Sequence, residues 1–122
     1  MKYNNNFEYD LKFGTKGENL LAKILLLKGD TIEVKTDKDA IQGKATNNVF
    51  VEYESRNKPS GISKSKAKWY AFVLSNENLI LIESKKLKDI CRKYLNSNRD
   101  VKGGDNNTSK GILLPLEDLI KL

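Results

Sequence analysis

The chain has 122 residues, of which 39% are hydrophobic and 31% are charged, and this size and composition predict a single soluble globular domain. Histidine is absent and cysteine occurs once, as Cys91, which excludes a disulfide framework, zinc fingers and a histidine general base. No apolar run is long enough to span a bilayer, so we expect a cytoplasmic protein with no membrane partner. The net charge of +6 suits a polyanionic partner.

The apolar pattern predicts one helix followed by two strands. Thr15 and Glu18 have the spacing of a capping box, and a helical stripe of leucine and isoleucine follows as far as Gly29. Residues 32–37 and 48–55 are β-type runs separated by a polar connection. We expect these two runs to pair as a hairpin.

The rest of the chain continues to mix helices and strands. The expected elements are a helix at 62–69, strands at 70–74 and 79–83, a helix beginning at Ser84, a loop at 96–110, a short strand at 112–114 and a terminal helix after Pro115. The apolar positions of the helix after Ser84 include Cys91, which we expect to be a core residue. The order α-β-β-α-β-β-α predicts an α/β fold, with a mixed sheet flanked by helices.

Acidic side chains alternate with apolar ones along the first two strands. Glu33, Lys35 and Asp37 share one face of the first strand, and Glu52 and Glu54 share one face of the second. In a hairpin these groups would converge on one patch, while the apolar residues between them face the core. Carboxylates without histidine or cysteine are hard oxygen ligands that suit Mg²⁺ or Mn²⁺. The alternative is that they are ordinary solvated strand charges.

With these residues in this order, residues 14–94 resemble the PD-(D/E)xK nuclease superfamily, which includes restriction endonucleases and Holliday-junction resolvases. The chain also looks like small phage-encoded endonucleases. The resemblance rests on an acidic residue near the start of a helix, followed by Asp37 on one strand and Glu52 on the next. It implies a restriction-endonuclease-like domain spanning 1–122 with its core at about 14–95. It also implies Mg²⁺-dependent hydrolysis of DNA, including branched or phage DNA.

Two registers of the nuclease motif are open. In the literal register, Glu33-Val34-Lys35 is the (D/E)xK triplet and Asp10 or Asp30 supplies the aspartate. In the other register, Asp37 and Glu52 are the two motif acids, and the lysine comes from position 35 on the same face as Asp37. We prefer the second register, because it places both acids on one hairpin and keeps the order of elements.

The resemblance implies a role for each site residue. Two acids hold the metal ion, and a lysine orients the attacking water or stabilises charge on phosphorus. A glutamate from the first helix adds a contact, and further acids are candidates for a second metal. The catalytic candidates are Lys35, Asp37, Glu52 and Glu18, and the metal-binding candidates are Asp37, Glu52, Glu54 and Glu33.

Basic and hydroxyl side chains follow the acidic strand and recur in the predicted loop at 96–110. The expected DNA phosphate contacts are Arg56, Lys58, Ser60, Lys64, Lys66, Arg99 and Lys102. One active site reaches one strand, so cutting both strands would take a homodimer. The competing function is a catalytically inactive nucleic-acid-binding module on the same fold, which would retard DNA without cleaving it.

Overall fold

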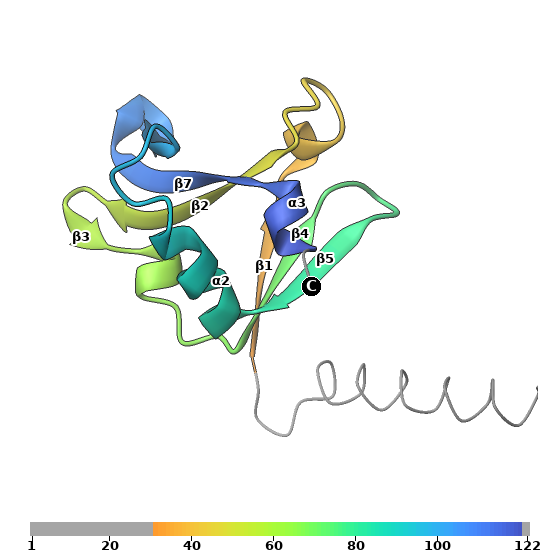
Figure 1. The fold of residues 1–122 in the computed structure, drawn as a ribbon, viewed down its shortest axis with the longest axis horizontal. Helices are drawn as coiled ribbons and strands as arrows, with labels where there is room; N and C mark the ends of the chain where they lie inside the picture. The colour runs from red at the N-terminus through yellow and green to blue at the C-terminus, as the bar shows by residue number, and fades with distance from the viewer. Residues whose placement is uncertain (1–30, 121–122) are drawn as a thin grey trace, which may run out of the picture. The chain divides into compact units, whose positions relative to one another are not determined.

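The computed structural model describes residues 31–120, and strands predominate in this part of the chain (Figure 1). One sheet has the order β1-β4-β5 and the other the order β3-β2-β7-β6. The first contains β1 (Ile32–Thr36), β4 (Trp69–Val73) and β5 (Leu79–Glu83). The second contains β3 (Lys58–Pro59), β2 (Asn48–Ser55), β7 (Ser109–Pro115) and β6 (Asp100–Gly103).

Helices contribute little to the described residues. They are α2 (Ser84–Arg92), α3 (Leu116–Leu119) and the short 3₁₀ helices η1 (Lys38–Ala40), η2 (Gly61–Ser63) and η3 (Asp105–Asn107). The fold is therefore mixed α/β, as expected, but with two sheets instead of one. The helix expected to begin at Thr15, with Glu18 in its first turn, lies outside the described residues. Within residues 31–120, no helix is long and apolar enough to cross a bilayer.

The expected hairpin of residues 32–37 and 48–55 is wrong. Both strands form, but β1 pairs in parallel with β4, and β2 pairs in antiparallel with β7. The connection between β1 and β2 contains η1, whose Ala40 is completely buried. This connection, anchored by Ala40, carries the chain from the first sheet to the second, so that consecutive strands become members of different sheets.

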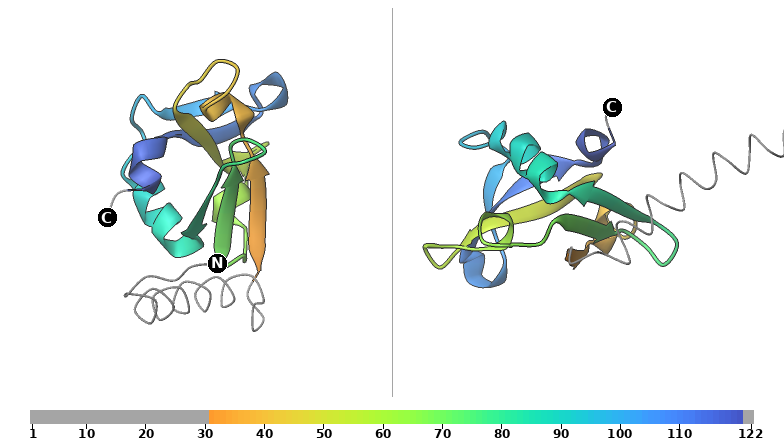
Figure 2. Two further views of the ribbon diagram at one scale, coloured as in Figure 1. Left: turned by 90° about the vertical axis from the view of Figure 1, so that its right-hand side faces the viewer. Right: turned by 90° about the horizontal axis from the view of Figure 1, so that it is seen from below.

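The core is built from both sheets and both helices. Figure 2 shows α2 and α3 on the same side of the two sheets. The largest of the fully buried side chains are Val49, Tyr70, Phe72, Leu87, Ile112 and Leu114. Cys91 also belongs to this cluster, which confirms its prediction as a core residue. Burial raises the pKa of its thiol to about 12, so it stays protonated and unreactive near neutral pH.

Two segments differ from the sequence-based expectation. The helix expected at 62–69 is wrong, because η2 ends at Ser63 and the chain then runs on to β4. Residues 63–68 alternate serine and lysine around a single alanine, so a helix there would have no apolar face to bury. The expected loop at 96–110 contains β6 and η3, because Val101 and its neighbours pair with β7. The strand β7 is itself longer than the strand expected at 112–114.

The ring of Phe50 lies across glycines of the neighbouring strands. A Cβ added at Gly103 would approach the Phe50 ring to 2.8 Å, and every atom that it would meet belongs to that ring. We expect Gly103→Ala to lower the free energy of unfolding by about 1–3 kcal/mol through overpacking. Urea denaturation of Gly103→Ala, Phe50→Leu and the double variant measures the coupling between the two sites. A double variant whose loss equals the sum of the single losses would contradict this packing.

Candidate active site

Glu33 and Lys35 lie on the inner face of β1. In the parallel register they stand opposite the core residues Tyr70 and Phe72, so their side chains leave the sheet on the same face. Lys35 Nζ lies 3.8 Å from Glu33 Oε1, and both side chains are partly exposed. Val34, which we expected to point into the core, is 59% exposed. The expected orientation of β1 is therefore wrong: the charged face, and not the apolar one, adjoins the core.

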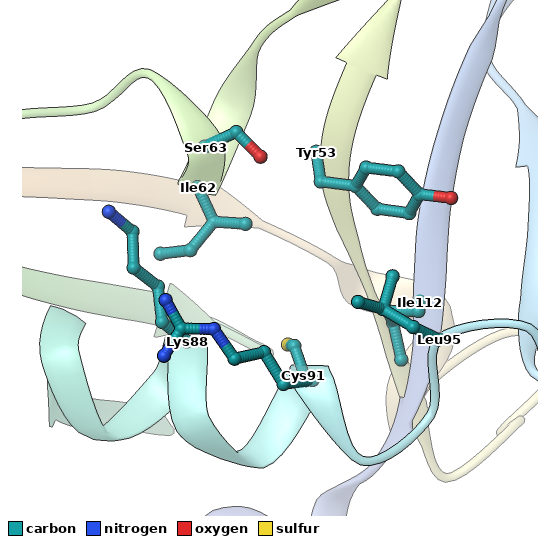
Figure 3. A pocket seen from close by; sticks show the side chains of 8 residues that line it. Tyr53, Ile62, Ser63, Lys88, Cys91, Leu95 and Ile112 are labelled. Atoms are coloured by element: carbon teal, nitrogen blue, oxygen red, sulfur yellow. The ribbon is translucent and has the colours of Figure 1, made fainter.

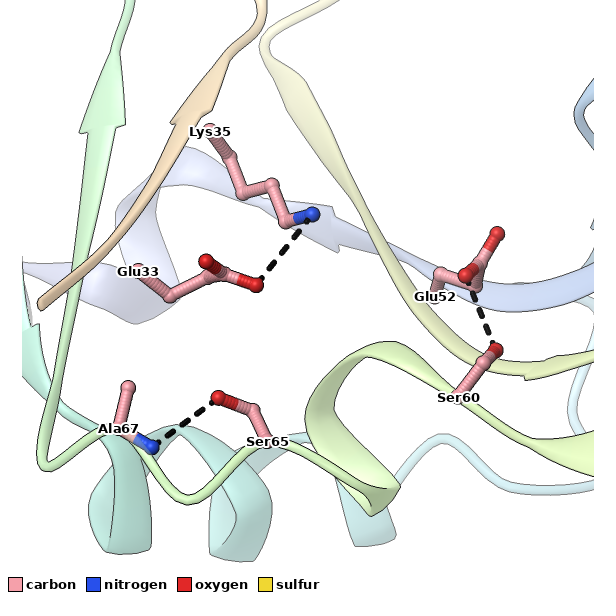
Figure 4. Close-up of polar contacts among 6 residues, drawn as sticks. All are labelled: Glu33, Lys35, Glu52, Ser60, Ser65 and Ala67. Atoms are coloured by element: carbon pink, nitrogen blue, oxygen red, sulfur yellow. Dashed lines mark hydrogen bonds and ion pairs between the residues drawn. The ribbon is translucent and has the colours of Figure 1, made fainter.

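Glu52 belongs to β2, in the other sheet, and Figure 4 shows it beside Ser60, apart from the Glu33–Lys35 pair. Its Oε2 accepts a hydrogen bond of 2.9 Å from the hydroxyl of Ser60, whose N–H donates to the Tyr53 carbonyl at 3.1 Å. The next residue, Gly61, begins η2 and lies so close to β2 that a Cβ on it would be 2.2 Å from the Glu52 carbonyl oxygen. The turn after β3 therefore holds the Glu52 carboxylate in place.

The phenol of Tyr70 is within electrostatic range of both Glu33 and Glu52. Tyr70 is 1% exposed, and its hydroxyl has no hydrogen-bond partner of ordinary geometry among the described residues. Burial raises the pKa of the phenol, the nearby Ser65 hydroxyl partly offsets the rise, and the charges of Glu33 and Glu52 raise it further. Both carboxylates therefore lie near enough to this buried phenol to disfavour its ionised form.

This group has the donor chemistry that a small divalent ion requires. Mg²⁺ is usually held by one or two carboxylates, with water and substrate phosphate completing its shell. Glu33 and Glu52 are both half-buried, and the uncompensated Tyr70 hydroxyl adds a hard oxygen beside them. No cluster of three or more metal-binding acids, histidines or cysteines occurs within residues 31–120. Glu33 and Glu52 match the number of carboxylates that such an ion usually takes from a protein.

Asp37, the first acid of the preferred register, has a defined partner in the other sheet. Its Oδ2 accepts the N–H of Phe50 at 3.3 Å, and its own N–H donates to the Val73 carbonyl at 2.9 Å. The residue therefore links the end of β1 to β4 by its backbone and to β2 by its side chain. This arrangement accounts for a half-buried acidic group at this position without requiring a metal.

Glu54 is separated from Glu52 by an irregularity in β2. The pairing of β2 with β7 shifts between these two residues, so the simple alternation expected for them is interrupted. Glu54 Oε2 lies 3.5 Å from Lys110 Nζ, whereas Glu52 is bonded to Ser60. The two carboxylates, expected to share a patch, have different partners.

A basic hollow surrounds Glu54 at the far end of the second sheet. It has a volume of about 340 Å³, and its cationic lining groups are Arg56, Lys102 and Lys110. Arg56 and Lys102 were predicted from the sequence as phosphate contacts, whereas Lys110 was not. Lys110 lies on the exposed side of β7 opposite Lys102. Like-charged residues opposite each other repel, so this pair favours an anion between them.

The other expected DNA contacts have varied surroundings. Lys58, Lys64 and Lys66 are exposed, whereas Ser60 is engaged with Glu52. The guanidinium of Arg99 donates hydrogen bonds of 2.9 Å to Asn48 Oδ1 and to the Leu113 carbonyl, which ties it to the strand ends. Glu18 lies outside the described residues. Tyr70 is not among the site residues predicted from the sequence, and the signal that could have marked it is a phenol within an otherwise apolar strand.

An apolar cavity of about 360 Å³ lies between α2 and the second sheet (Figure 3). Ile62, Leu95 and Ile112 line it together with Cys91, and the basic side chains of α2 stand at its edge. The Tyr53 hydroxyl donates a 2.6 Å hydrogen bond to Asp100, which raises the pKa of Tyr53 to about 12. The phenol and the thiol that line this cavity are thus both protonated near neutral pH.

Comparison of the chain with models of protein families, with characterised proteins and with solved structures finds no match. The resemblance to PD-(D/E)xK nucleases therefore stays a hypothesis based on the residues of this chain. The geometry at Glu33, Lys35, Glu52 and Tyr70 is the basis on which we develop it.

Proposed function

We propose that the protein is a divalent-metal-dependent nuclease that hydrolyses phosphodiester bonds of DNA. The observation that carries the proposal is that Glu33, which is paired with Lys35, and Glu52, which belongs to the other sheet, both raise the pKa of the buried Tyr70 phenol. These residues combine two hard-oxygen ligands with a cation, the set that phosphodiester hydrolysis requires. The metal pair that we favour is Glu33 and Glu52, in place of Asp37 and Glu52, since the Asp37 carboxylate bonds a backbone amide.

Each residue of the cluster has a distinct task in this proposal. A bound Mg²⁺ or Mn²⁺ would polarise the phosphodiester and lower the pKa of an attacking water. Lys35 stabilises the negative charge that develops on the phosphoryl oxygens, while its contact with Glu33 keeps its ammonium group at the site. Ser60 fixes the orientation of the Glu52 carboxylate by donating to it. Tyr70 stays protonated and can donate a hydrogen bond to a substrate oxygen.

The basic hollow formed by Arg56, Lys102 and Lys110 would bind backbone phosphates away from the cluster. Contacts of this kind carry affinity without reading sequence, and they weaken as salt rises. Incubation of the full chain with supercoiled plasmid, linear duplex and branched DNA tests the function. Nicking that needs Mg²⁺ or Mn²⁺ and that EDTA abolishes supports the proposal.

A nucleic-acid-binding module without catalysis is the second candidate. It is favoured by the ion pair of Lys35 with Glu33 and by the hydrogen bond from Phe50 N–H to Asp37. In both interactions the carboxylate already has a partner within the protein and does not need a metal ion. The absence of a cluster of three metal-binding residues within residues 31–120 also favours it. Retardation of DNA without cleavage, in Mg²⁺ and in Mn²⁺ and for every DNA form, would select this candidate.

Lys35→Ala is expected to reduce kcat about 100-fold while changing the Kd for DNA by no more than about threefold, because its charge is needed mainly in the transition state. Lys38→Ala is the matched control, since Lys38 is an exposed lysine of the neighbouring η1. Single-turnover cleavage gives the rate, and DNA retardation gives the affinity. Lys35→Arg should restore part of the rate. Equal losses for Lys35→Ala and Lys38→Ala would show that Lys35 acts only through general surface charge.

A further inference from the structure

The N-terminus of α2 opens onto a second basic hollow, apart from the one around Glu54. It has a volume of about 350 Å³ and lies where the chain between η2 and β4 passes the start of the helix (Figure 1). Its lining includes Ser65 and Ser84 and four lysines, Lys66, Lys68, Lys85 and Lys88, with Glu83 as its one acid. The lining is therefore strongly basic, which favours an anion in the hollow.

The helix itself is left without a cap at this end. Glu83 occupies the N-cap position without forming a side-chain cap, and the first turn contains no acidic residue. The N–H of Ser84 donates to the Lys68 carbonyl at 2.8 Å, but those of Lys85 and Lys86 have no earlier carbonyl within the helix. Lysines in a first turn oppose the helix dipole. This end of α2 is therefore electropositive and retains backbone donors.

Ser84 provides an independent sign of a ligand. The residue is 8% exposed and lines the hollow, yet its hydroxyl has no hydrogen-bond partner among the described residues. A buried hydroxyl that forms no hydrogen bond lowers the stability of the protein, because it has lost its hydrogen bonds to water. A bound oxyanion in the hollow would accept its hydrogen bond and remove this cost. Serine, uncapped amides and lysines are together the donor set that holds phosphate at a helix N-terminus.

We propose that this hollow is a binding site for a phosphoryl group, held by Ser84, Lys85 and Lys88 at the start of α2. Lys88 is half-buried, which makes it the lysine with the most restricted position among those of the helix that line the hollow. Glu83 opposes the bound charge and limits the affinity. The site does not require the proposed cleavage, because phosphate binding there involves neither Glu33 nor Glu52.

Titration of the full chain with inorganic phosphate, in the absence of divalent metal and with amide NMR spectra as readout, tests the site. The Ser84 and Lys85 amide signals should shift and saturate. Lys88→Ala should raise the Kd roughly tenfold, since a charge-assisted hydrogen bond is lost. Lys86→Ala is the matched control, because Lys86 is an exposed lysine of the same turn that does not line the hollow. Equal weakening by the two variants, or shifts that never saturate, would overturn the proposal.

Ser84→Ala separates a binding role from a structural one. It should weaken phosphate binding several-fold and yet leave the phosphate-free protein as stable as before, or more stable, because it removes a buried hydroxyl without a partner. Glu83→Gln should tighten binding. Undiminished phosphate binding in Ser84→Ala, together with a lower free energy of unfolding, would assign the serine a purely structural role and overturn the proposal.

Short oligonucleotides identify the source of the phosphoryl group. A 5′-phosphorylated oligonucleotide that binds more tightly than its 5′-hydroxyl counterpart, with the difference lost in Lys88→Ala, supports a site for a terminal phosphate monoester. Equal binding of the two, still sensitive to Lys88→Ala, supports a site for a backbone diester. Insensitivity of both to Lys88→Ala would contradict the site, whatever the outcome of the cleavage assays.

Discussion

Replacing Glu52 with glutamine is expected to lower divalent-dependent DNA cleavage at least about 100-fold, because it removes a charge that holds the metal ion. Glutamine keeps the shape of the side chain, and its carbonyl oxygen still accepts the hydrogen bond from Ser60, so the fold should persist. DNA retardation should be unchanged or stronger, since the site repels phosphate less. Glu33→Gln should behave in the same way, and Asp39→Asn, at an exposed acid in η1, is the control.

Asp37→Asn decides between the two possible metal pairs. The pairing chosen from the sequence predicts the same loss for Asp37→Asn as for Glu52→Gln. The geometry favours retained activity, because an asparagine carbonyl can still accept the Phe50 N–H. Cleavage by Glu33→Gln at the wild-type rate, with none by Asp37→Asn, would show that Glu33 is not a ligand. A wild-type protein that binds DNA but cleaves no form of it would refute the nuclease proposal itself.

Gly61→Ala is expected to lower the free energy of unfolding by about 2–4 kcal/mol, through backbone strain and a steric clash together. Gly61 has a φ of +49°, and its new Cβ would lie 2.2 Å from the carbonyl oxygen of Glu52, a backbone atom that cannot move aside. The clash pushes η2 away from β2 and takes the Ser60 hydroxyl with it. Urea denaturation measures the stability, and cleavage by the remaining folded protein should also fall.

Gly43→Ala is a matched control for this substitution. Gly43 has a similar φ of +56°, but the nearest atom to its added Cβ is a side-chain oxygen of Asp39, which can rotate away. Its cost should be limited to the backbone strain, about 1 kcal/mol. Equal losses in the two variants would mean that the close approach of Gly61 to β2 contributes nothing to stability.

Local patterns in the sequence were sufficient to find most of the strands and α2. The alternating residues 48–55 form β2 over those bounds, and the helical spacing around Leu87 and Cys91 corresponds to their burial in α2. The pairing of strands was not accessible in the same way, because a period of two indicates a strand but does not identify its neighbour. The parallel partner of β1 and the antiparallel partner of β2 both lie far along the chain.

The candidate site was predictable in its residue types and not in its geometry. Glu33, Lys35 and Glu52 were all identified from their alternation with apolar residues. The face of β1 that adjoins the core was predicted wrongly. As an edge strand of its sheet, β1 can place the stems of charged side chains beside the core while their tips reach solvent. The separation of Glu52 from Glu54 depends on an irregularity in β2 that no residue type marks. Asp37 has its partner in a different sheet, which only the tertiary fold reveals.

The late position of β7 in the chain has a consequence for the way the protein folds. Asn48 at the start of β2 pairs with Pro115, so the longest ladder of the second sheet joins residues from opposite ends of the described chain. Contacts this distant in sequence require a large loop to close before they stabilise anything, which places such proteins among the slower folders. During synthesis, β2 has no main partner until the final strand leaves the ribosome, and Val49 and Val51 stay uncovered until then.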